Sequence, residues 1–320
     1  MSEDGSDRTR GHLAAAAGTD PGAEVARSCP LACSHPFVMG VLGGVAVALG
    51  ASLLAAIQTG APGGYGGAAL LAGLGLSAGL FLASVGRCAV FAGTPAPFLS
   101  WFRAEMSTER FAGCLLSTLA GNILGALAVV WLAFVAGQYA LAGSEVGQTA
   151  LGIAAHKCAL PFVSMLIRGF LGGALVALAL WLAADAQSIT DRAVAVAIPS
   201  VLLVACGFGH CVSDLYLVST GLAIQAWEAV PGDVPAITVG ALILRVFIPG
   251  ALGGLLGAGF AVGALHWAGH VRTSPTPRQA RPHPRRRPLR EDEPPSLRPR
   301  TQRRQTRPRT RLDDEDPEGS

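Results

Sequence analysis

Long apolar stretches alternate with short polar segments over the middle of the chain. A helix that spans a bilayer needs about 20 consecutive apolar residues. Six stretches reach this length, and they cover residues 36–57, 67–91, 111–139, 156–184, 193–222 and 236–267. The pattern therefore predicts an all-α membrane protein with six transmembrane helices.

Two of the six predicted helices are interrupted. The second runs into Thr94-Pro95-Ala96-Pro97, where two prolines in three residues oppose a continuous helix, and a short helix is expected at 98–106. The fifth contains Gly207-Phe208-Gly209-His210 near its middle. These are the middle members of two halves of three helices. Breaks in such positions favour a 3+3 inverted repeat with a site between the broken helices at the membrane midplane.

Charge is concentrated at one end of the chain. Only 14% of the residues are charged, against roughly a quarter in soluble proteins. Of the 24 Lys and Arg residues, 14 lie in residues 271–320, which leaves 10 for the rest. This composition predicts a disordered N-terminus at 1–35, a transmembrane domain at 36–267 and a disordered Arg/Pro-rich tail at 271–320.

The same distribution predicts an orientation. An even number of spans puts both termini on one side, and the arginine tail identifies that side as the cytoplasm, so the expected location is the plasma membrane. On a membrane body, a topology or lipid-surface role for the tail ranks above binding of nucleic acid, which is not expected.

Other classes of function have little support in the sequence. The spacing of the seven cysteines is not that of a disulfide framework. A metal site at Cys29 and Cys33 lacks a second ligand pair, and one at Cys206, His210 and Cys211 has a ligand that turns away on a helix. Phosphate loops, nucleophile–base pairs and dinucleotide motifs are not found, so neither an enzyme nor a cofactor is expected.

Polar residues inside the spans are the candidates for function, because ionisable groups at membrane depth are costly. His210 either lines a pathway or bonds a carbonyl of a neighbouring helix. Lys157, the one lysine of the chain, either extends to the interface or attracts anions. Asn122 requires a partner on another helix. For Arg87 we favour an interfacial or structural role over one in a pore.

Several motifs, in the same order along the chain, resemble those of the formate/nitrite transporter family over residues 36–267. Gly207–Asp214 is similar to the family's fifth-helix GFEHSVAN, and Val90–Thr94 to the LFTGN loop. Gly121–Gly125 is similar to GNLIG, Leu171–Trp181 to LCNWLVCLAVW and Pro249–Gly254 to GNIIGG, and Lys157 stands where the family has a vestibule lysine. The resemblance implies an aquaporin-like protomer, a homopentamer in the lipid bilayer, and passage of small monovalent anions together with protons.

The resemblance also implies a set of pathway residues: His210, Lys157, Thr94, Asn122 and Asp214. It further implies apolar constrictions, which fall on Leu76, Leu80, Val90, Phe91 and Leu203. Polar positions of the family are lost at several places. The loop threonine is Ala92 here, the loop asparagine is Thr94, and the glutamate before the histidine is Gly209. The asparagine after the histidine is Asp214, and two further asparagines are Gly173 and Gly250.

An anion is expensive to place in hydrocarbon, whereas a neutral weak acid is not. Imidazole titrates near pH 6.5 in water, so His210 is expected to supply a proton or a hydrogen bond to an anion that Lys157 concentrates. Asp214, one helical turn away, favours the charged histidine and opposes proton release unless it is neutral or paired with Arg87 or Arg245. The alternative function is a scaffold or sensor without transport activity that acts through the Arg-rich tail.

Overall fold

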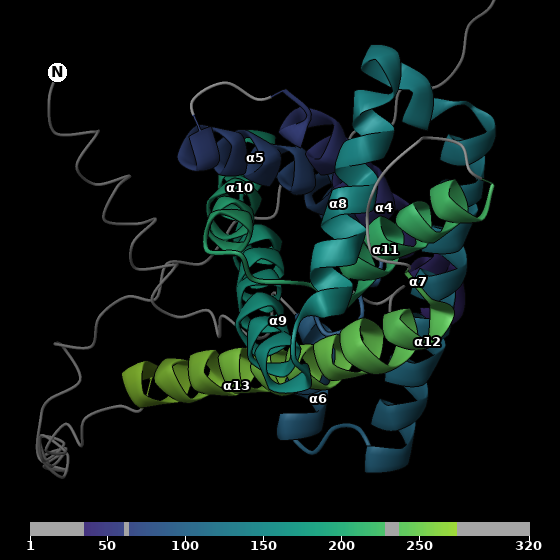
Figure 1. Ribbon diagram of the computed structural model, residues 1–320. Coiled ribbons are helices and arrows are strands. Elements are labelled where there is room, and N and C mark those ends of the chain that lie inside the picture. The colour runs from purple at the N-terminus through teal and green to yellow at the C-terminus, as the bar shows by residue number, and fades with distance from the viewer. Residues whose placement is uncertain (1–34, 61–63, 228–236, 274–320) are drawn as a thin grey trace, which may run out of the picture. The chain divides into compact units, whose positions relative to one another are not determined.

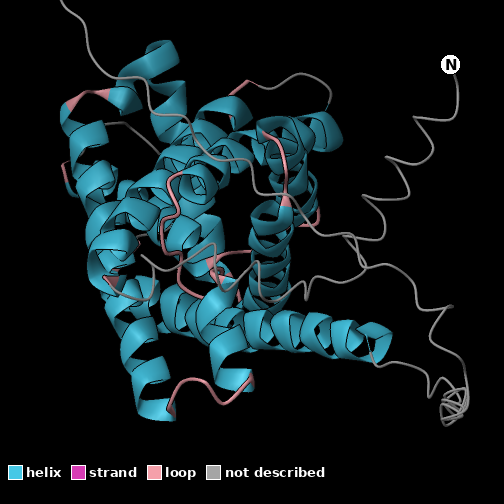
Figure 2. Ribbon diagram, turned by 180° about the vertical axis from the view of Figure 1, so that it is seen from behind, coloured by secondary structure: helices cyan, strands magenta, loops and turns pink. Residues whose placement is uncertain are grey.

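The computed structural model describes residues 35–60, 64–227 and 237–273, and the regular secondary structure in these ranges is helical throughout (Figures 1 and 2). The chain divides into two units, residues 1–274 and 275–320. The two predicted disordered ends, 1–35 and 271–320, lie outside the described residues apart from His35 and the last three residues of the final helix.

Five helices in the described ranges are long and apolar enough to cross a membrane. Their mean hydropathy and length confirm the prediction of an all-helical membrane protein. Four are single α-helices and the fifth is a composite of residues 239–268; the four are α4 (Pro36–Gln58), α5 (Gly64–Val85), α7 (Thr108–Val135) and α9 (Phe162–Asp185). Shorter helices lie between them, namely α6 (Pro95–Phe102), α8 (Glu145–Ala159), α10 (Ile189–Ala205) and α11 (Cys211–Ala226).

The predicted span at 156–184 is two helices in the structure. A 3₁₀ segment, η1 (Gln138–Ser144), leads into α8, which ends at Ala159. Leu160 is extended with ψ of 141°, because the ring of Pro161 opposes a helical residue before it. Residues 145–155, which precede the predicted span, are therefore part of α8, and Lys157 lies in the last turn of α8 and not at the start of a span.

The composite helix begins with α12 (Val239–Ala241), continues through a π-helical segment, η2 (Leu242–Phe247), and ends as α13 (Ile248–Thr273). The amide of Ile248 donates to the carbonyl of Ile243, five residues back. Pro249 follows at once and has no amide hydrogen to donate. The π turn widens the helix where the proline interrupts its hydrogen bonds, so the chain passes Pro249 without breaking.

Small residues allow the membrane helices to pack closely. α4 packs against α7, and α9 packs against α13. A Cβ atom at Gly44 of α4 would collide with the backbone of Asn122, and one at Gly173 of α9 would collide with the backbone of Gly254. Backbones this close are typical of helix pairs in membranes. There, helix association depends on van der Waals packing, which small residues allow, and not on the hydrophobic effect.

Two non-helical segments interrupt the helices near the centre of the molecule. The first joins α5 to α6 through residues 86–94, and the second joins α10 to α11 through residues 206–210. α10 ends because Gly207 adopts φ of +70°, a left-handed conformation that glycine reaches without steric cost. α10 packs against both α5 and α9, while α11 packs against α8, α7 and α4.

Candidate functional site

His210 joins the two non-helical segments. It is the N-terminal flanking residue of α11, and it is only 2% exposed. Its Nε2 lies 3.2 Å from the carbonyl oxygen of Phe91. The contact is made with the backbone of the 86–94 segment, in which Ala92 has no hydroxyl group to offer. The carbonyl can only accept, so Nε2 carries the hydrogen in this contact.

The other ring nitrogen of His210, Nδ1, is also buried. Nδ1 has no hydrogen bond within the described ranges. With Nε2 protonated, the neutral ring presents a lone pair at Nδ1, and the cation presents an N–H there. Either form can bind an oxygen-bearing ligand at Nδ1 without giving up the contact to Phe91.

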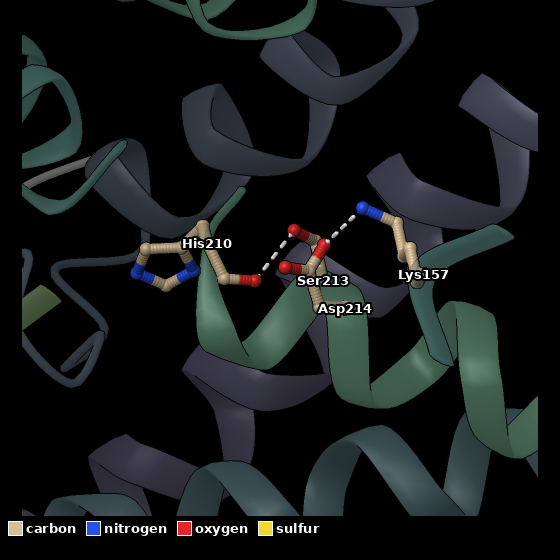
Figure 3. A network of polar contacts seen from close by, with 4 residues as sticks. All are labelled: Lys157, His210, Ser213 and Asp214. Carbon is tan, nitrogen blue, oxygen red and sulfur yellow. Dashed lines mark hydrogen bonds and ion pairs between the residues drawn. The ribbon is translucent and has the colours of Figure 1, made fainter. Parts of the chain in front are cut away.

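Lys157 and Asp214 form an ion pair. Lys157 Nζ lies 2.8 Å from Asp214 Oδ1, and the side chains are 18% and 3% exposed (Figure 3). Asp214 is therefore paired, but its partner is neither of the predicted arginines, Arg87 and Arg245. Ser213 Oγ donates to the carbonyl oxygen of His210 at 2.9 Å, and in Figure 3 the imidazole ring points away from the ion pair.

Gly209 gives the carboxylate of Asp214 its space. A Cβ atom built on Gly209 would collide with Asp214 Oδ2. That oxygen is buried and has no hydrogen bond in the part of the chain that the structure describes. The glycine at 209 and the aspartate at 214 thus fit each other, so two departures from the family motif form one local arrangement.

A cavity of about 450 Å³ opens beside this ion pair, and we call it the vestibule. Lys157, Arg168 and Asp214 line it with their charged side chains. Two of the predicted constriction residues, Leu76 and Leu203, also line it and are each 2% exposed. The vestibule therefore combines charged walls with an apolar boundary.

A smaller cavity of about 50 Å³, the distal cavity, lies toward the other end of the same helices. Arg87, Thr94 and Arg192 line it, so Arg87 does border a cavity. On α5, Tyr65 lines the vestibule and Ser84 lines the distal cavity. At 1.5 Å per residue, these two residues are about 28 Å apart along the helix, which is close to the thickness of the hydrocarbon core.

The other three predicted constriction residues line neither cavity. Leu80 and Val90 are each 1% exposed and Phe91 is 5% exposed. On α5, Leu80 lies one turn from Leu76 in the direction of the distal cavity. The structure therefore places buried apolar side chains along α5 between the two cavities.

Asn122 and Thr94 bind backbone groups. Asn122 is fully buried; its Nδ2 donates to the carbonyls of Gly40 and Ala89 at 2.6 and 2.9 Å, and its Oδ1 accepts from the amide of Phe91 at 2.7 Å. Thr94 Oγ1 accepts from the amide of Val90 at 2.8 Å. The expected partner of Asn122 on another helix is the α4 carbonyl of Gly40. Both side chains hold the 86–94 segment in place.

Sequence reasoning missed the arginines at the cavities. Arg168 of α9 lines the vestibule, and Arg192 of α10 lines the distal cavity and donates to the carbonyl of Ser84 at 3.4 Å. The signal was available, because each is a rare charge at or near a predicted span. As for a metal centre, three His, Cys, Asp or Glu residues do not come together anywhere in the described ranges. Cys206 is exposed and Cys211 is buried, and Cys29 and Cys33 lie outside those ranges.

The family model described as "Formate/nitrite transporter" matches residues 22–268 of the chain. The chain belongs to the formate/nitrite transporter family. This membership, with the five apolar helices, identifies a membrane protein of a transporter family.

Known members of the formate/nitrite transporter family are similar over most of the chain. The "Formate channel FocA" of Escherichia coli is 29% identical over 217 residues, which are 65% of this chain and 76% of that protein. The "Formate channel FocA" of Haemophilus influenzae is 24% identical over 239 residues, which are 72% of this chain and 84% of that protein.

Solved structures of the formate/nitrite transporter family share the fold. A "Pentameric formate channel with formate bound" aligns with a TM-score of 0.68 at 23% identity, over 75% of this chain and 98% of that one. An "FNT family ion channel" aligns with a TM-score of 0.65 at 21% identity, over 78% and 96% of the two chains.

Proposed function

We propose that this protein is a membrane channel for small monovalent weak-acid anions, of which formate is the first candidate. The similar proteins named as formate channels support this substrate class. The observation that carries the proposal is the buried Nδ1 of His210, which has no hydrogen bond within the described ranges. It lies on the segment between α10 and α11, where the vestibule residues Leu203 and Asp214 flank His210 in sequence.

The architecture that goes with this function has six membrane-spanning elements. In it α10 and α11 together form the fifth element, broken at 206–210, and α5 and α6 form the second, broken at 86–94. The positions of these breaks support a 3+3 inverted repeat. By analogy with the pentameric relative, five copies assemble in the plasma membrane, and the Arg-rich tail supports a cytoplasmic location for both termini.

The mechanism follows from the cost of an anion in an apolar passage. An anion that enters the vestibule loses its water at Leu76 and Leu203. The protonated ring of His210 then transfers the proton from Nδ1 to an oxygen of the anion, while Nε2 keeps its bond to Phe91. The neutral acid crosses the apolar section and returns the proton to water on the far side. A new proton from water restores the ring.

Flux into proteoliposomes tests this proposal. A panel of small anions is supplied to the wild type, His210→Ala and His210→Phe at acidic and neutral pH. Formate or a related anion is expected to enter faster at acidic pH with the wild type and to lose most of that pH dependence in both variants. His35→Ala, at the exposed start of α4, is the matched control because the structure gives His35 no side-chain capping bond.

Two outcomes would overturn the proposal. Flux with the same pH dependence in the wild type and the His210 variants would exclude a role for the histidine. An intact oligomer that passes none of the anions would remove the channel itself. The scaffold alternative depends on the Arg-rich tail, which lies outside the described residues, and the comparisons give it no support.

A further inference from the structure

Lys157 is not the only charged residue that lines the vestibule. Within the described ranges, its lining includes two permanent cations, Lys157 and Arg168, and one carboxylate, Asp214. The carboxylate lies 2.8 Å from Lys157 Nζ and is almost fully buried, so the two charges largely cancel as seen from the cavity. Lys157, which is expected to attract anions, is thus already paired with the carboxylate of Asp214.

Arg168 is in a different position. It lies on α9, its side chain lines the vestibule, and no ion pair to it is found within the described ranges. Its guanidinium lies beside the 206–210 segment, since a Cβ atom on Gly207 would be 3.9 Å from Nη1. The backbone holds this place, because the carbonyl of Arg168 accepts from the amide of Gly209 at 3.4 Å. Among the described residues that line the vestibule, the cation without an ion pair therefore lies next to the segment that carries His210.

We propose that Arg168, and not Lys157, recruits the anion in this protein, and that it favours small anions with two oxygen atoms, such as a carboxylate or nitrite. The planar guanidinium offers two parallel N–H donors that match two oxygens, which a lysine ammonium does not. Asp214 acts as a positioning residue that holds Lys157. This inference rests on the proposed function and assigns its recruiting site.

Cys206 provides a readout that needs no transport. It is an exposed thiol that lines the vestibule together with Arg168. We would label the reconstituted full-length protein with methanethiosulfonates that carry either a sulfonate or a trimethylammonium group, and quantify Cys206 by peptide mass spectrometry. The ratio of the anionic to the cationic labelling rate measures the electrostatic potential of the vestibule.

Three variants separate the two cations. Arg168→Gln removes the free charge and is expected to lower the ratio by roughly three- to tenfold. Asp214→Asn releases Lys157 and is expected to raise it by a similar factor. The double variant Lys157→Gln/Asp214→Asn removes the pair as a unit and is expected to change the ratio less than about twofold.

Arg245→Gln is the matched control, because Arg245 lines a separate cavity of about 520 Å³ and should leave the ratio at Cys206 unchanged. The result that overturns the assignment is a fall in the ratio for the double variant together with no fall for Arg168→Gln. Gel filtration confirms that each variant is an intact oligomer before labelling.

Competition by anions tests the preference for two oxygens. At constant ionic strength, formate or acetate is expected to slow anionic labelling of the wild type more than chloride does. Arg168→Lys keeps the charge, so it should keep the labelling ratio but lose the advantage of the carboxylates. Equal competition by carboxylates in Arg168→Lys and in the wild type would overturn the two-oxygen preference.

The two proposals fail separately. Labelling does not require flux, so a protein that passes no anion can still show the Arg168 effect. Conversely, flux that depends on His210 but is insensitive to Arg168→Gln, with an unchanged labelling ratio, would retain the channel and reject Arg168 as the recruiting residue.

Discussion

The two non-helical segments at the centre of the molecule are held in different ways. In the 86–94 segment, side chains bind the backbone: Asn122 accepts from Phe91 and donates to Ala89, and Thr94 accepts from Val90. In the 206–210 segment, Ser213 Oγ donates to the carbonyl of His210, but the backbone contact across to α9 is long, at 3.4 Å from Gly209 to Arg168. Nδ1 of His210 there has no partner in the described ranges.

The two segments therefore have different roles, one structural and one chemical. The 86–94 segment is a fixed acceptor, whose carbonyl at Phe91 sets the orientation of the imidazole ring. The 206–210 segment carries groups that are left available for chemistry, and it depends on the other segment for its geometry. Substitutions in the 86–94 segment should therefore mainly lower stability, whereas substitutions in the 206–210 segment should in addition alter binding and flux.

The largest expected effect comes from Asn122→Ala. It removes three hydrogen bonds and leaves the amide of Phe91 and two carbonyls without these partners in a buried place. At 1–3 kcal/mol for each unsatisfied buried group, a destabilisation of about 3 kcal/mol or more is expected. Denaturation in detergent measures it.

Gln187→Ala is the matched control for Asn122→Ala, because this amide is exposed and donates only to the nearby carbonyl of Asp185 among the described contacts. If the two variants were equally stable, Asn122 would not be the residue that holds the 86–94 segment.

Gly209→Ala should have an intermediate effect. The new methyl group would collide with Asp214 Oδ2, so the carboxylate must move and its contact with Lys157 must change. Overpacking of this kind costs about 1–3 kcal/mol. The expected result is a lower midpoint of thermal unfolding together with an altered labelling ratio at Cys206.

Gly152→Ala serves as the control for Gly209→Ala. Gly152 lines the same vestibule on α8, and a Cβ atom there would meet nothing within 4 Å. Alanine in this helix should keep or raise stability, since glycine is the poorer helix former. A Gly209→Ala protein that unfolds and labels like Gly152→Ala would contradict the steric fit between Gly209 and Asp214.

The smallest effect is expected for Thr94→Val. This nearly isosteric change removes the acceptor for the amide of Val90, while the backbone bond from the amide of Thr94 to the carbonyl of Val90 is kept. A loss of about 1 kcal/mol in the free energy of unfolding is expected. Thr94→Ser keeps the hydroxyl and should recover most of that loss; no recovery would exclude the hydrogen bond as the cause.

The sequence predicted features that depend on local chemistry. Gly207 marks the end of α10 and Pro95 marks the start of α6, because the backbone preferences of glycine and proline act on their immediate neighbours. The apolar runs predict the five membrane-length helices, because the length and hydropathy of a span are properties of consecutive residues. The break at Leu160 was missed although Pro161 was visible, because the apolar pattern continues across it.

Pairings between residues far apart along the chain could not be predicted from the sequence. Lys157 and Asp214 come from α8 and α11, and they meet only because those helices pack together. Charge alone predicts Arg87 or Arg245 as the partner of Asp214, but charge does not encode the distance between residues. Arg168 was overlooked because its importance depends on which cation the carboxylate occupies, and only the packed structure decides that.

The π turn at Leu242–Phe247 has a consequence for comparing this chain with its relatives. One residue corresponds to about 100° of rotation on an α-helix, so a wide turn accommodates an extra residue without rotating the helix that follows it. Relatives that lack the wide turn would align with a one-residue gap in this segment. Such a gap would mark the insertion or loss of a single codon, with the packing of α13 against α9 preserved on both sides of the event.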